Sequence, residues 1–304
     1  MIPAAARREL TELLDDRVEF DAPLSRHTSL RVGGPADALA LPADRAELSQ
    51  LLGICRSHRL PHTVLGAGFN TLVLDGGLPG VVVKLSKLRR LEERPGPALR
   101  AEAGVSHSQI TRFCAAHGFS GLEFGAGIPG TVGGWIAMNA GIPKREVEAR
   151  VREIEVMSPT GQRRHLARAG VRFAYRALRG LAPGSVIVSV LLSVTLSSPA
   201  AVRAEIESLL ARRAATQPLD VPSCGSVFKN PPGDHAGRLI EAAGLKGRRA
   251  GGAEISPIHA NFIANVGGAT AADVLALIEL AQQSVHEQTG IHLEPEVRIV
   301  GRQA

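Results

Sequence analysis

The sequence predicts a protein of mixed helices and strands, of the α+β or mixed α/β class, and three features indicate this. Helix-like and strand-like segments both occur along the 304 residues, but they alternate irregularly. The loops between them are rich in glycine, which the chain uses 33 times. No internal repeat or low-complexity segment is present. A regular doubly wound sheet needs steady alternation of strand and helix, so the pattern argues against one.

The predicted helices begin at capping residues and carry apolar residues on one face. Asp44 and Ser106 supply two of these caps, and Thr270 with Asp273 forms a capping box for a third helix. A charged helix is also expected over residues 202–213. The stop signals of the three capped helices are Pro61, Gly118 and Gly290.

Short apolar runs bounded by glycine and proline are typical of strands. They cover residues 63–65, 81–85, 151–157, 186–196 and 293–300. None approaches the ~20 apolar residues of a membrane helix, and the N-terminus has no apolar signal core. The three cysteines form no CxxC pair, so a disulfide framework is not expected and a reducing compartment is favoured. We expect a soluble, cytoplasmic protein.

Length and charge limit the classes of function. A chain of this length predicts about two domains, with a boundary near residues 197–199 where a strand ends and the charged helix begins. The net charge of +6 would suit an anionic partner such as a diphosphate substrate, but the basic residues are scattered, which favours a solvated basic surface. Aromatic residues make up only 3%, so a platform for stacking bases is hard to assemble and nucleic acid is not expected.

Two glycine-rich loops are candidates for holding phosphate groups. One covers residues 66–71 and the other residues 125–134, where GxGxxG is formally satisfied. Glycine lets main-chain N–H groups approach phosphate oxygens. The dinucleotide fingerprint should follow a buried strand and open a long helix, whereas residues 121–124 form a poor strand and Gly141 cuts the next helix short, so we reject it. The two loops favour a dinucleotide in a pocket, and tight turns between strands remain the alternative.

Six separated motifs, in order, resemble one known family. They are RHTSLRVGGPA at residues 26–36, the loop at 66–71, GIPGTVGG at 127–134, GSVFKNP at 225–231, LIEAAGLKG at 239–247 with HANFI at 259–263, and LEPEVRIVG at 293–301. Together they resemble the UDP-N-acetylenolpyruvoylglucosamine reductases, in the shorter-chain subclass, over roughly residues 25–301. Motifs in register are far more specific than any one of them.

The resemblance implies an α+β fold with a vanillyl-alcohol-oxidase-type FAD-binding region of two subdomains and a C-terminal α+β substrate domain. The expected ranges are 1–197 for the FAD region, with subdomains of about 20–85 and 86–197, and 198–304 for the UDP-sugar domain. FAD is expected to be non-covalent, with NADPH as hydride donor. The implied reaction reduces UDP-N-acetylglucosamine enolpyruvate to UDP-N-acetylmuramate for peptidoglycan precursors. We expect a monomer that binds neither nucleic acid nor membrane.

The resemblance also assigns three catalytic residues. Reduction of the enolpyruvyl group places negative charge on its carboxylate, which the bidentate guanidinium of Arg176 would stabilise. Glu296 matches a glutamate assigned to the same intermediate. Ser226 matches the serine that protonates the neighbouring carbon, and Lys229 is a candidate for polarising its hydroxyl. Without the family, each of the three would be read as a surface or turn residue.

The remaining site predictions concern ligand contacts. The expected substrate contacts are Tyr175, Lys229, Asn230 and Asn261. The expected cofactor contacts are Gly66, Ala67, Gly68, Phe69, Asn70, Gly127, Ile128, Pro129, Gly130, Thr131 and Gly133. No metal ligands are predicted, because Pro61 disrupts the helix that would pair His58 with His62. Cys224 has no base nearby in the sequence to activate it as a nucleophile.

Two departures from the family pattern and two alternative functions accompany these predictions. Residues 142–146 read IPKRE where many relatives have AYGGE, which puts contacts at the flavin edge in question. Ala177 and Leu178 replace a small residue and a serine beside Arg176.

Two alternative functions are kept. One is an alcohol oxidase of the wider flavin superfamily, which would not depend on NADPH. The other is a colourless module that binds nucleic acid with a steep salt dependence.

Overall fold

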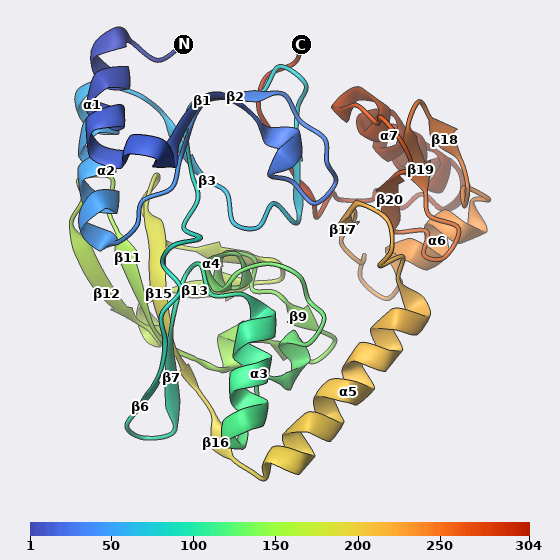
Figure 1. Cartoon of the computed structure of the whole chain (residues 1–304). Helices are drawn as coiled ribbons and strands as arrows, with labels where there is room; N and C mark the ends of the chain where they lie inside the picture. Colours follow the sequence, from blue (N-terminus) through green and yellow to red (C-terminus); the bar gives the residue numbers. More distant parts are fainter. The chain divides into compact units, whose positions relative to one another are not determined.

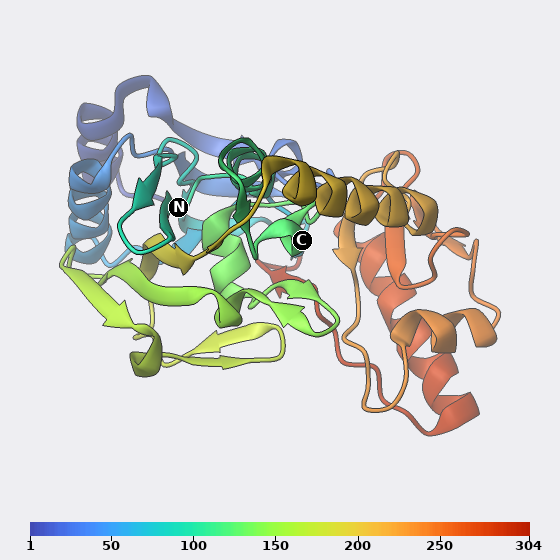
Figure 2. The same ribbon diagram turned by 90° about the horizontal axis from the view of Figure 1, so that it is seen from below.

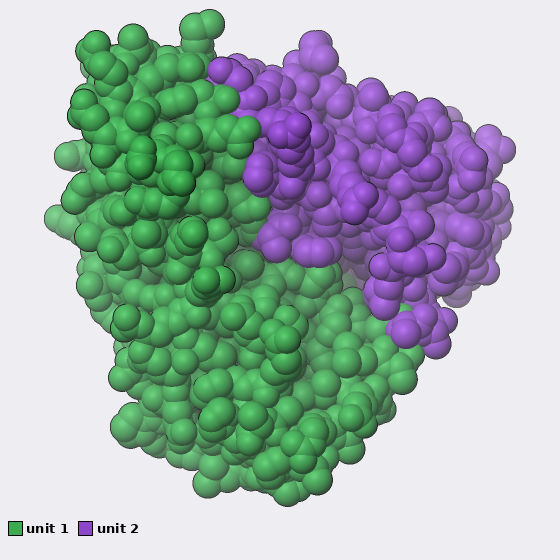
Figure 3. Space-filling model, in the orientation of Figure 1, with its two compact units in different colours: residues 1–20, 38–66, 80–213 green, residues 21–37, 67–79, 214–304 purple.

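The computed structural model describes all 304 residues and divides them into two compact units. Unit 1 comprises residues 1–20, 38–66 and 80–213, and unit 2 comprises residues 21–37, 67–79 and 214–304 (Figure 3). The chain therefore passes between the units at five points.

Unit 1 contains most of the helices and strands. Its helices are α1 (Ala4–Leu14), α2 (Arg45–Ser57), α3 (His107–His117), α4 (Val132–Ala137) and most of α5 (Pro199–Thr216). Its strands are β3 (His62–Val64), β6 (Leu91–Arg94), β7 (Ala98–Glu102), β8 (Phe119–Ser120), β9 (Gly141–Ile142), β10 (Arg145–Glu146), β11 (Val151–Met157), β12 (Arg163–Ala167), β13 (Arg172–Ala174), β14 (Ala177–Arg179), β15 (Val186–Ser193) and β16 (Thr195–Leu196). Three strands continue from one unit into the other: β1 (Val18–Pro23), β2 (Pro35–Ala40) and β5 (Leu78–Val83).

The largest sheet of unit 1 has the order β12-β11-β15-β7-β6, and its neighbouring strands are antiparallel. Its central strand β15 supplies Val186 and Val188 to one apolar cluster and the intervening Ile187 to another, so both of its faces are packed. A strand that packs on both faces reads as a continuous apolar run, which is how residues 186–193 appear in the sequence. A second sheet has the order β1-β2-β5-β3.

Helices α1 and α2 lie side by side and share one of these clusters (Figure 1, Figure 2). Asp44 caps α2 by accepting hydrogen bonds from the N–H groups of Ala46 and Glu47, at 2.8 and 2.9 Å. The buried side chains of α2 are the predicted Leu48, Leu51, Leu52 and Cys55. The capping box of α3 at Ser106 and its left-handed Gly118 are also as predicted.

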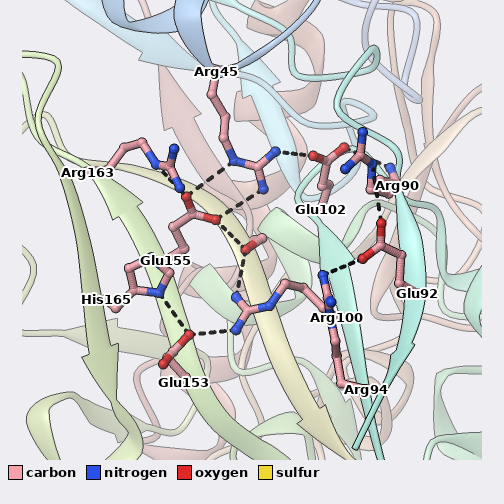
Figure 4. A network of polar contacts seen from close by, with 11 residues as sticks. Arg45, Arg90, Glu92, Arg94, Arg100, Glu102, Glu153, Glu155, Arg163 and His165 are labelled. Atoms are coloured by element: carbon pink, nitrogen blue, oxygen red, sulfur yellow. Dashed lines mark hydrogen bonds and ion pairs between the residues drawn. The ribbon is translucent and has the colours of Figure 1, made fainter.

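A network of arginines and glutamates joins α2 to the large sheet (Figure 4). Glu155 on β11 is 2% exposed and accepts hydrogen bonds from Arg45 at 3.1 and 3.2 Å and from Ser189 at 2.7 Å. Arg45 also pairs with Glu102 on β7. Burial disfavours the charged carboxylate, but the hydrogen bonds from Arg45 and Ser189 outweigh it and lower the pKa of Glu155 to about 2. The ion pair therefore holds α2 against strands β7 and β11.

Unit 2 is a smaller α+β body with its own apolar core. Its sheet has the order β17-β20-β19-β18, and α7 packs against β18 and β19 (Figure 1). The predicted capping box of α7 is present, with Thr270 accepting from Asp273, and the helix ends at left-handed Gly290. The elements of unit 2 are β4 (Thr71–Val73), β17 (Ser223–Ser226), α6 (Ala236–Ala242), β18 (Arg249–Ala250), β19 (Ala253–Ile255), β20 (Phe262–Asn265), α7 (Ala271–Thr289) and β21 (Arg298–Val300).

One strand prediction is wrong over most of its length. Residues 293–300 were expected to form a single strand, but only Arg298–Val300 does, pairing in parallel with β4. Pro295 forms only an isolated bridge with Phe228. Proline lacks the N–H that a sheet ladder needs, so regular pairing cannot pass through it. Glu296 consequently lies on an irregular segment.

Candidate functional site

The glycine loop at residues 125–134 does not have the geometry of a dinucleotide fingerprint. A 3-10 turn, Glu123–Gly125, precedes it in place of a strand, and the following α4 has only six residues. The rejection of the fingerprint is therefore confirmed. Gly133 packs closely on residue 103, since a Cβ at Gly133 would lie 3.1 Å from the Cβ of Ala103.

Unpaired main-chain N–H groups gather where the two glycine loops meet within unit 1. The N–H groups of Gly66, Gly127, Gly130 and Thr131 donate no hydrogen bond to the chain. A Cβ on Gly66 would lie 3.0 Å from Oγ1 of Thr131, so the ends of the two loops are in contact. Because unpaired main-chain donors bind anions well, this cradle suits the oxygens of a phosphate.

Arg213, in the last turn of α5, adds positive charge beside the cradle. Its side chain lies against Gly127, where a Cβ would be 2.7 Å from Cδ and 2.9 Å from Nε. Its Nε atom is buried without a hydrogen-bond partner, and no carboxylate pairs with the guanidinium. Burial lowers the pKa of Arg213, but an arginine retains its charge at neutral pH. A buried donor without a partner is costly, so an anion bound here would satisfy the Nε–H group of Arg213. The cradle and Arg213 together fit the pyrophosphate of FAD.

His107 fixes the shape of the same loop. Its imidazole is 3% exposed, and burial lowers its pKa to about 4, so the ring is neutral at pH 7. Nδ1 lies 2.8 Å from the carbonyl of Ile128, and since a carbonyl only accepts, Nδ1 carries the proton. The ring also packs on Trp135, at 4.5 Å between centroids. His107 therefore holds the main chain of Ile128 in place.

Arg176 and Tyr175 form the two-residue turn between β13 and β14 in unit 1. Arg176 has a left-handed backbone with φ of 55°, which is unfavourable for a residue with a Cβ. Its guanidinium lies 4.7 Å above the ring of Tyr175, and its Nη1 donates to Glu146 at 3.1 Å. Tyr175 is 45% exposed. This turn thus presents an ordered arginine next to an accessible phenol.

The remaining residues of the first glycine loop belong to unit 2. A Cβ on Gly68 would lie 2.1 Å from the carbonyl oxygen of His27, so only glycine fits there. Phe69 is 38% exposed. Asn70 is left-handed, with φ of 53°, and its Nδ2 donates to the carbonyl of Glu296 at 3.1 Å. This loop therefore connects directly to the segment that carries Glu296.

Ser226 lies at a β-bulge in strand β17. The register of β17 against β20 shifts between Ser223 and Ser226, and Gly225 between them has φ of 82°. A bulge re-aims the side chain beside it. The hydroxyl of Ser226 makes no hydrogen bond with the chain, which leaves it available to a ligand. Burial raises the pKa of neighbouring Cys224 to about 12, so its thiol is not a nucleophile.

The predicted substrate contacts of unit 2 have partners within the chain. Lys229 forms an ion pair with Glu294, and no contact joins it to Ser226. The side-chain oxygen of Asn230 accepts from the N–H of Ala236, at the start of α6, at 3.0 Å. Asn261 is 4% exposed and bonds both main-chain groups of Phe228, at 2.8 and 2.9 Å. Asn261 therefore supports the segment that follows Ser226.

Glu296 is held by its main chain. Its N–H donates to the carbonyl of Val227 at 2.7 Å, which joins residue 296 to the residue after Ser226. Together with the bond from Asn70, this fixes Glu296 relative to Ser226 within unit 2. The structure thus brings together Ser226, Glu296 and the loop at residues 67–70.

Sequence reasoning did not predict a role for three residues that lie at the site: Arg213, His107 and Glu146. Arg213 lies in the predicted charged helix, but nothing in the sequence distinguishes it from Arg212. His107 directly follows a predicted cap, and its imidazole could have been considered as a buried group. Glu146 was treated only as part of a segment that departs from the family pattern.

Comparison with known proteins gives consistent matches across the chain. Residues 217–300 match the family described as UDP-N-acetylenolpyruvoylglucosamine reductase, C-terminal domain, and residues 36–167 match the FAD binding domain. The UDP-N-acetylenolpyruvoylglucosamine reductase of Anaeromyxobacter dehalogenans (strain 2CP-C) is 49% identical over 92% of this chain and 85% of its own length. The reductase of the same name from Geobacter metallireducens is 46% identical over 93% of this chain and 94% of its own length.

Solved structures agree with the sequence relatives. The crystal structure of UDP-N-acetylenolpyruvylglucosamine reductase from Thermus caldophilus covers 93% of this chain and 97% of its own, with a TM-score of 0.80 and 35% identity. An alkyldihydroxyacetonephosphate synthase covers 64% of this chain and 41% of its own, with a TM-score of 0.50 and 19% identity, which reflects the fold alone.

The match to the FAD binding domain and the likeness to the solved reductase identify an FAD-containing oxidoreductase with the α+β fold expected from the sequence. Identity of 41–49% over most of the chain is more specific than the fold. The chain belongs to the UDP-N-acetylenolpyruvoylglucosamine reductase family.

Proposed function

We propose that this chain reduces the enolpyruvyl ether of UDP-N-acetylglucosamine enolpyruvate to the lactyl ether of UDP-N-acetylmuramate, with NADPH as reductant. The observation that carries the proposal is the cradle of unpaired N–H groups beside the unpaired Arg213. These groups would hold the FAD pyrophosphate. Bound FAD, once reduced by NADPH, supplies the hydride, which no side chain can deliver.

The proposed role of Arg176 is to hold the substrate carboxylate. Hydride addition to the β-carbon leaves the α-carbon and carboxylate negatively charged. A guanidinium aimed at that carboxylate stabilises the charge as it develops. Arg176 suits the role because its ion pair with Glu146 and its contact with Tyr175 keep it ordered.

The proposed role of Ser226 is to give its hydroxyl proton to the α-carbon, which completes the addition of H⁻ and H⁺ across the double bond. The bulge at Gly225 and the absence of a partner within the chain suit a hydroxyl that must reach a ligand. Glu296 is proposed to share a proton with the oxygens of the charged intermediate. Lys229 is not proposed to polarise Ser226, because no contact joins the two residues.

The proposed contacts to the UDP-sugar are Tyr175, Lys229, Asn230 and Asn261. Tyr175 is accessible, and the ion pair of Lys229 with Glu294 could open to an anionic ligand. Asn261 would act indirectly, by ordering the main chain of residues 227–229. For FAD, we propose contacts with residues 66–70, 127–131 and 133.

The proposed organisation is an FAD-binding region at residues 1–197, with subdomains of about 20–85 and 86–197, and a UDP-sugar domain at residues 198–304. We propose a monomer in the cytoplasm with no nucleic-acid partner. None of the helices has both the length and the apolar content needed to cross a lipid bilayer.

A titration tests the site. Adding UDP-N-acetylglucosamine enolpyruvate to the oxidised, FAD-loaded protein should perturb the flavin absorbance and saturate. Absence of any perturbation, together with reduction of the flavin by simple alcohols and rapid reoxidation by oxygen, would instead identify an alcohol oxidase.

A further inference from the structure

A buried chain of hydrogen bonds leads from the core of unit 1 to Arg176. Asn139 is 0% exposed, and its Nδ2 donates to Oε2 of Glu146 at 2.9 Å and to the carbonyl of Ala174 at 3.2 Å. Its Oδ1 accepts from the N–H of Glu148 at 3.1 Å. The other oxygen of Glu146, Oε1, accepts from Nη1 of Arg176 at 3.1 Å. Each carboxylate oxygen of Glu146 thus has a different partner.

The main chain of the β9–β10 hairpin supplies a second contact. Glu146 pairs with Gly141 across the hairpin, and the carbonyl of Gly141 accepts from Nη2 of Arg176 at 3.4 Å. Only glycine fits at position 141, because a Cβ would lie 2.1 Å from the carbonyl oxygen of Arg145. Two acceptors on one hairpin therefore contact the two terminal nitrogens of one guanidinium and fix its plane.

Backbone strain accompanies this arrangement. Arg176 occupies the second position of a two-residue turn with φ of 55°, where glycine or asparagine is usual. Asn139 and Lys144 are also left-handed, with φ of 42° and 69°. Strained residues persist where the surroundings over-determine them, and they concentrate at functional sites.

We propose that Glu146, held by Asn139, is a positioning residue that sets the angle at which Arg176 meets the substrate carboxylate. The proposal rests on the proposed function, in which Arg176 binds that carboxylate. The alternative is that Glu146 only neutralises a nearby positive charge.

Two variants separate these roles. Glu146→Gln removes the charge, and Glu146→Asp keeps the charge but withdraws it by one methylene. If Glu146 positions Arg176, both variants should slow reoxidation of the reduced flavin by the enolpyruvyl substrate. The expected loss for Glu146→Gln is about 10²-fold, because even a small misplacement of a catalytic group lowers the rate strongly. A merely neutralising role predicts instead that Glu146→Asp behaves as wild type and Glu146→Gln binds the anionic substrate more tightly.

Further readouts distinguish positioning from loss of structure. Reduction of the flavin by NADPH should be unchanged, and so should the affinity for UDP-N-acetylglucosamine, which lacks the carboxylate. In the Arg176→Lys background, Glu146→Gln should cause no further loss, because the two residues act as one unit. The matched control is Glu148→Gln. This variant removes the carboxylate of Glu148, which lies two residues after Glu146 in the sequence and pairs with Arg168.

The outcomes separate the two proposals. Wild-type protein that is reduced by NADPH but not reoxidised by the enolpyruvyl substrate would overturn the proposed function. Normal wild-type reoxidation together with normal rates in both Glu146 variants would overturn the positioning role alone. Should Glu146→Gln not bind FAD, Glu146→Asp and its coupling to Arg176→Lys still decide the question.

Discussion

At the scale of single residues, backbone conformation marks the proposed site. Eight residues other than glycine have left-handed backbones. Two of them, Asn70 and Arg176, are proposed to act on FAD or substrate, and Asn139 and Lys144 lie in or beside the β9–β10 hairpin that contacts Arg176. Such positions cost about 1–3 kcal/mol each, so the surrounding contacts must hold these four residues in place.

Replacing Ser226 by alanine should separate the two half-reactions. NADPH should still bleach the flavin, whereas reoxidation by the enolpyruvyl substrate should slow by roughly 10²–10⁴-fold, the usual contribution of a general acid. Anaerobic stopped-flow absorbance measures both rates. Ser223→Ala on the same strand is the control, and wild-type reoxidation in Ser226→Ala would remove Ser226 from the mechanism.

Arg176→Lys keeps the charge but loses the planar, bidentate fork. We expect a loss of about 10²–10³-fold in reoxidation, comparable with removal of one donor from an oxyanion site. Steady-state kcat and KM for the enolpyruvyl substrate, together with the rate of flavin reduction by NADPH, would measure it. Near-normal kcat/KM would contradict the carboxylate-binding role.

Arg213→Met should weaken FAD binding. The loss of one charge-assisted hydrogen bond to a pyrophosphate is worth about 1.5–3 kcal/mol, so the Kd should rise roughly ten- to hundred-fold. Fluorescence titration of apoprotein with FAD measures this without any turnover. Arg203→Met, at an exposed position of the same helix, is the control; equal Kd values in both variants would exclude Arg213 from the cradle.

At the scale of elements, what the sequence could predict depended on whether the signal was local. The caps at Asp44, Ser106 and Thr270 were readable because a cap and its apolar face lie within one helix. The strand predicted over residues 293–300 was too long, because Pro295 interrupts regular pairing and the partner of Arg298–Val300 is the distant strand β4. The motif residues of the site were found through family resemblance, but Arg213 and Glu146 act through tertiary contacts that no local pattern reveals.

The ion pair that joins α2 to the large sheet should make stability depend on pH. The folded-state pKa of Glu155 is about 2, against an ordinary value of 4.5, so its contribution is present above pH 4.5 and is lost as the pH falls toward 2. The shift corresponds to about 3 kcal/mol. The free energy of unfolding, measured in urea between pH 6 and 3, should therefore depend less on pH for Glu155→Gln than for wild type. Glu92→Gln, at a more exposed ion pair, should retain the wild-type slope.

At the scale of the whole molecule, the two units are assembled from interleaved segments. Residues 21–37 and 67–79 belong to the same unit as the C-terminal part of the chain. Such interleaving cannot be read from composition, because no linker marks it. It places Gly66 in one unit and Ala67 to Asn70 in the other, so a single glycine loop contributes residues to both.

The most direct test of the account is one anaerobic experiment on the FAD-loaded protein. NADPH is added until the flavin absorbance is bleached, UDP-N-acetylglucosamine enolpyruvate is then mixed in, and the absorbance and the mass of the UDP-sugar are followed. We predict recovery of the oxidised flavin spectrum with a gain of two hydrogens in the sugar nucleotide. A preparation that takes up no FAD, or a reduced flavin that persists beside unchanged substrate, would contradict the account.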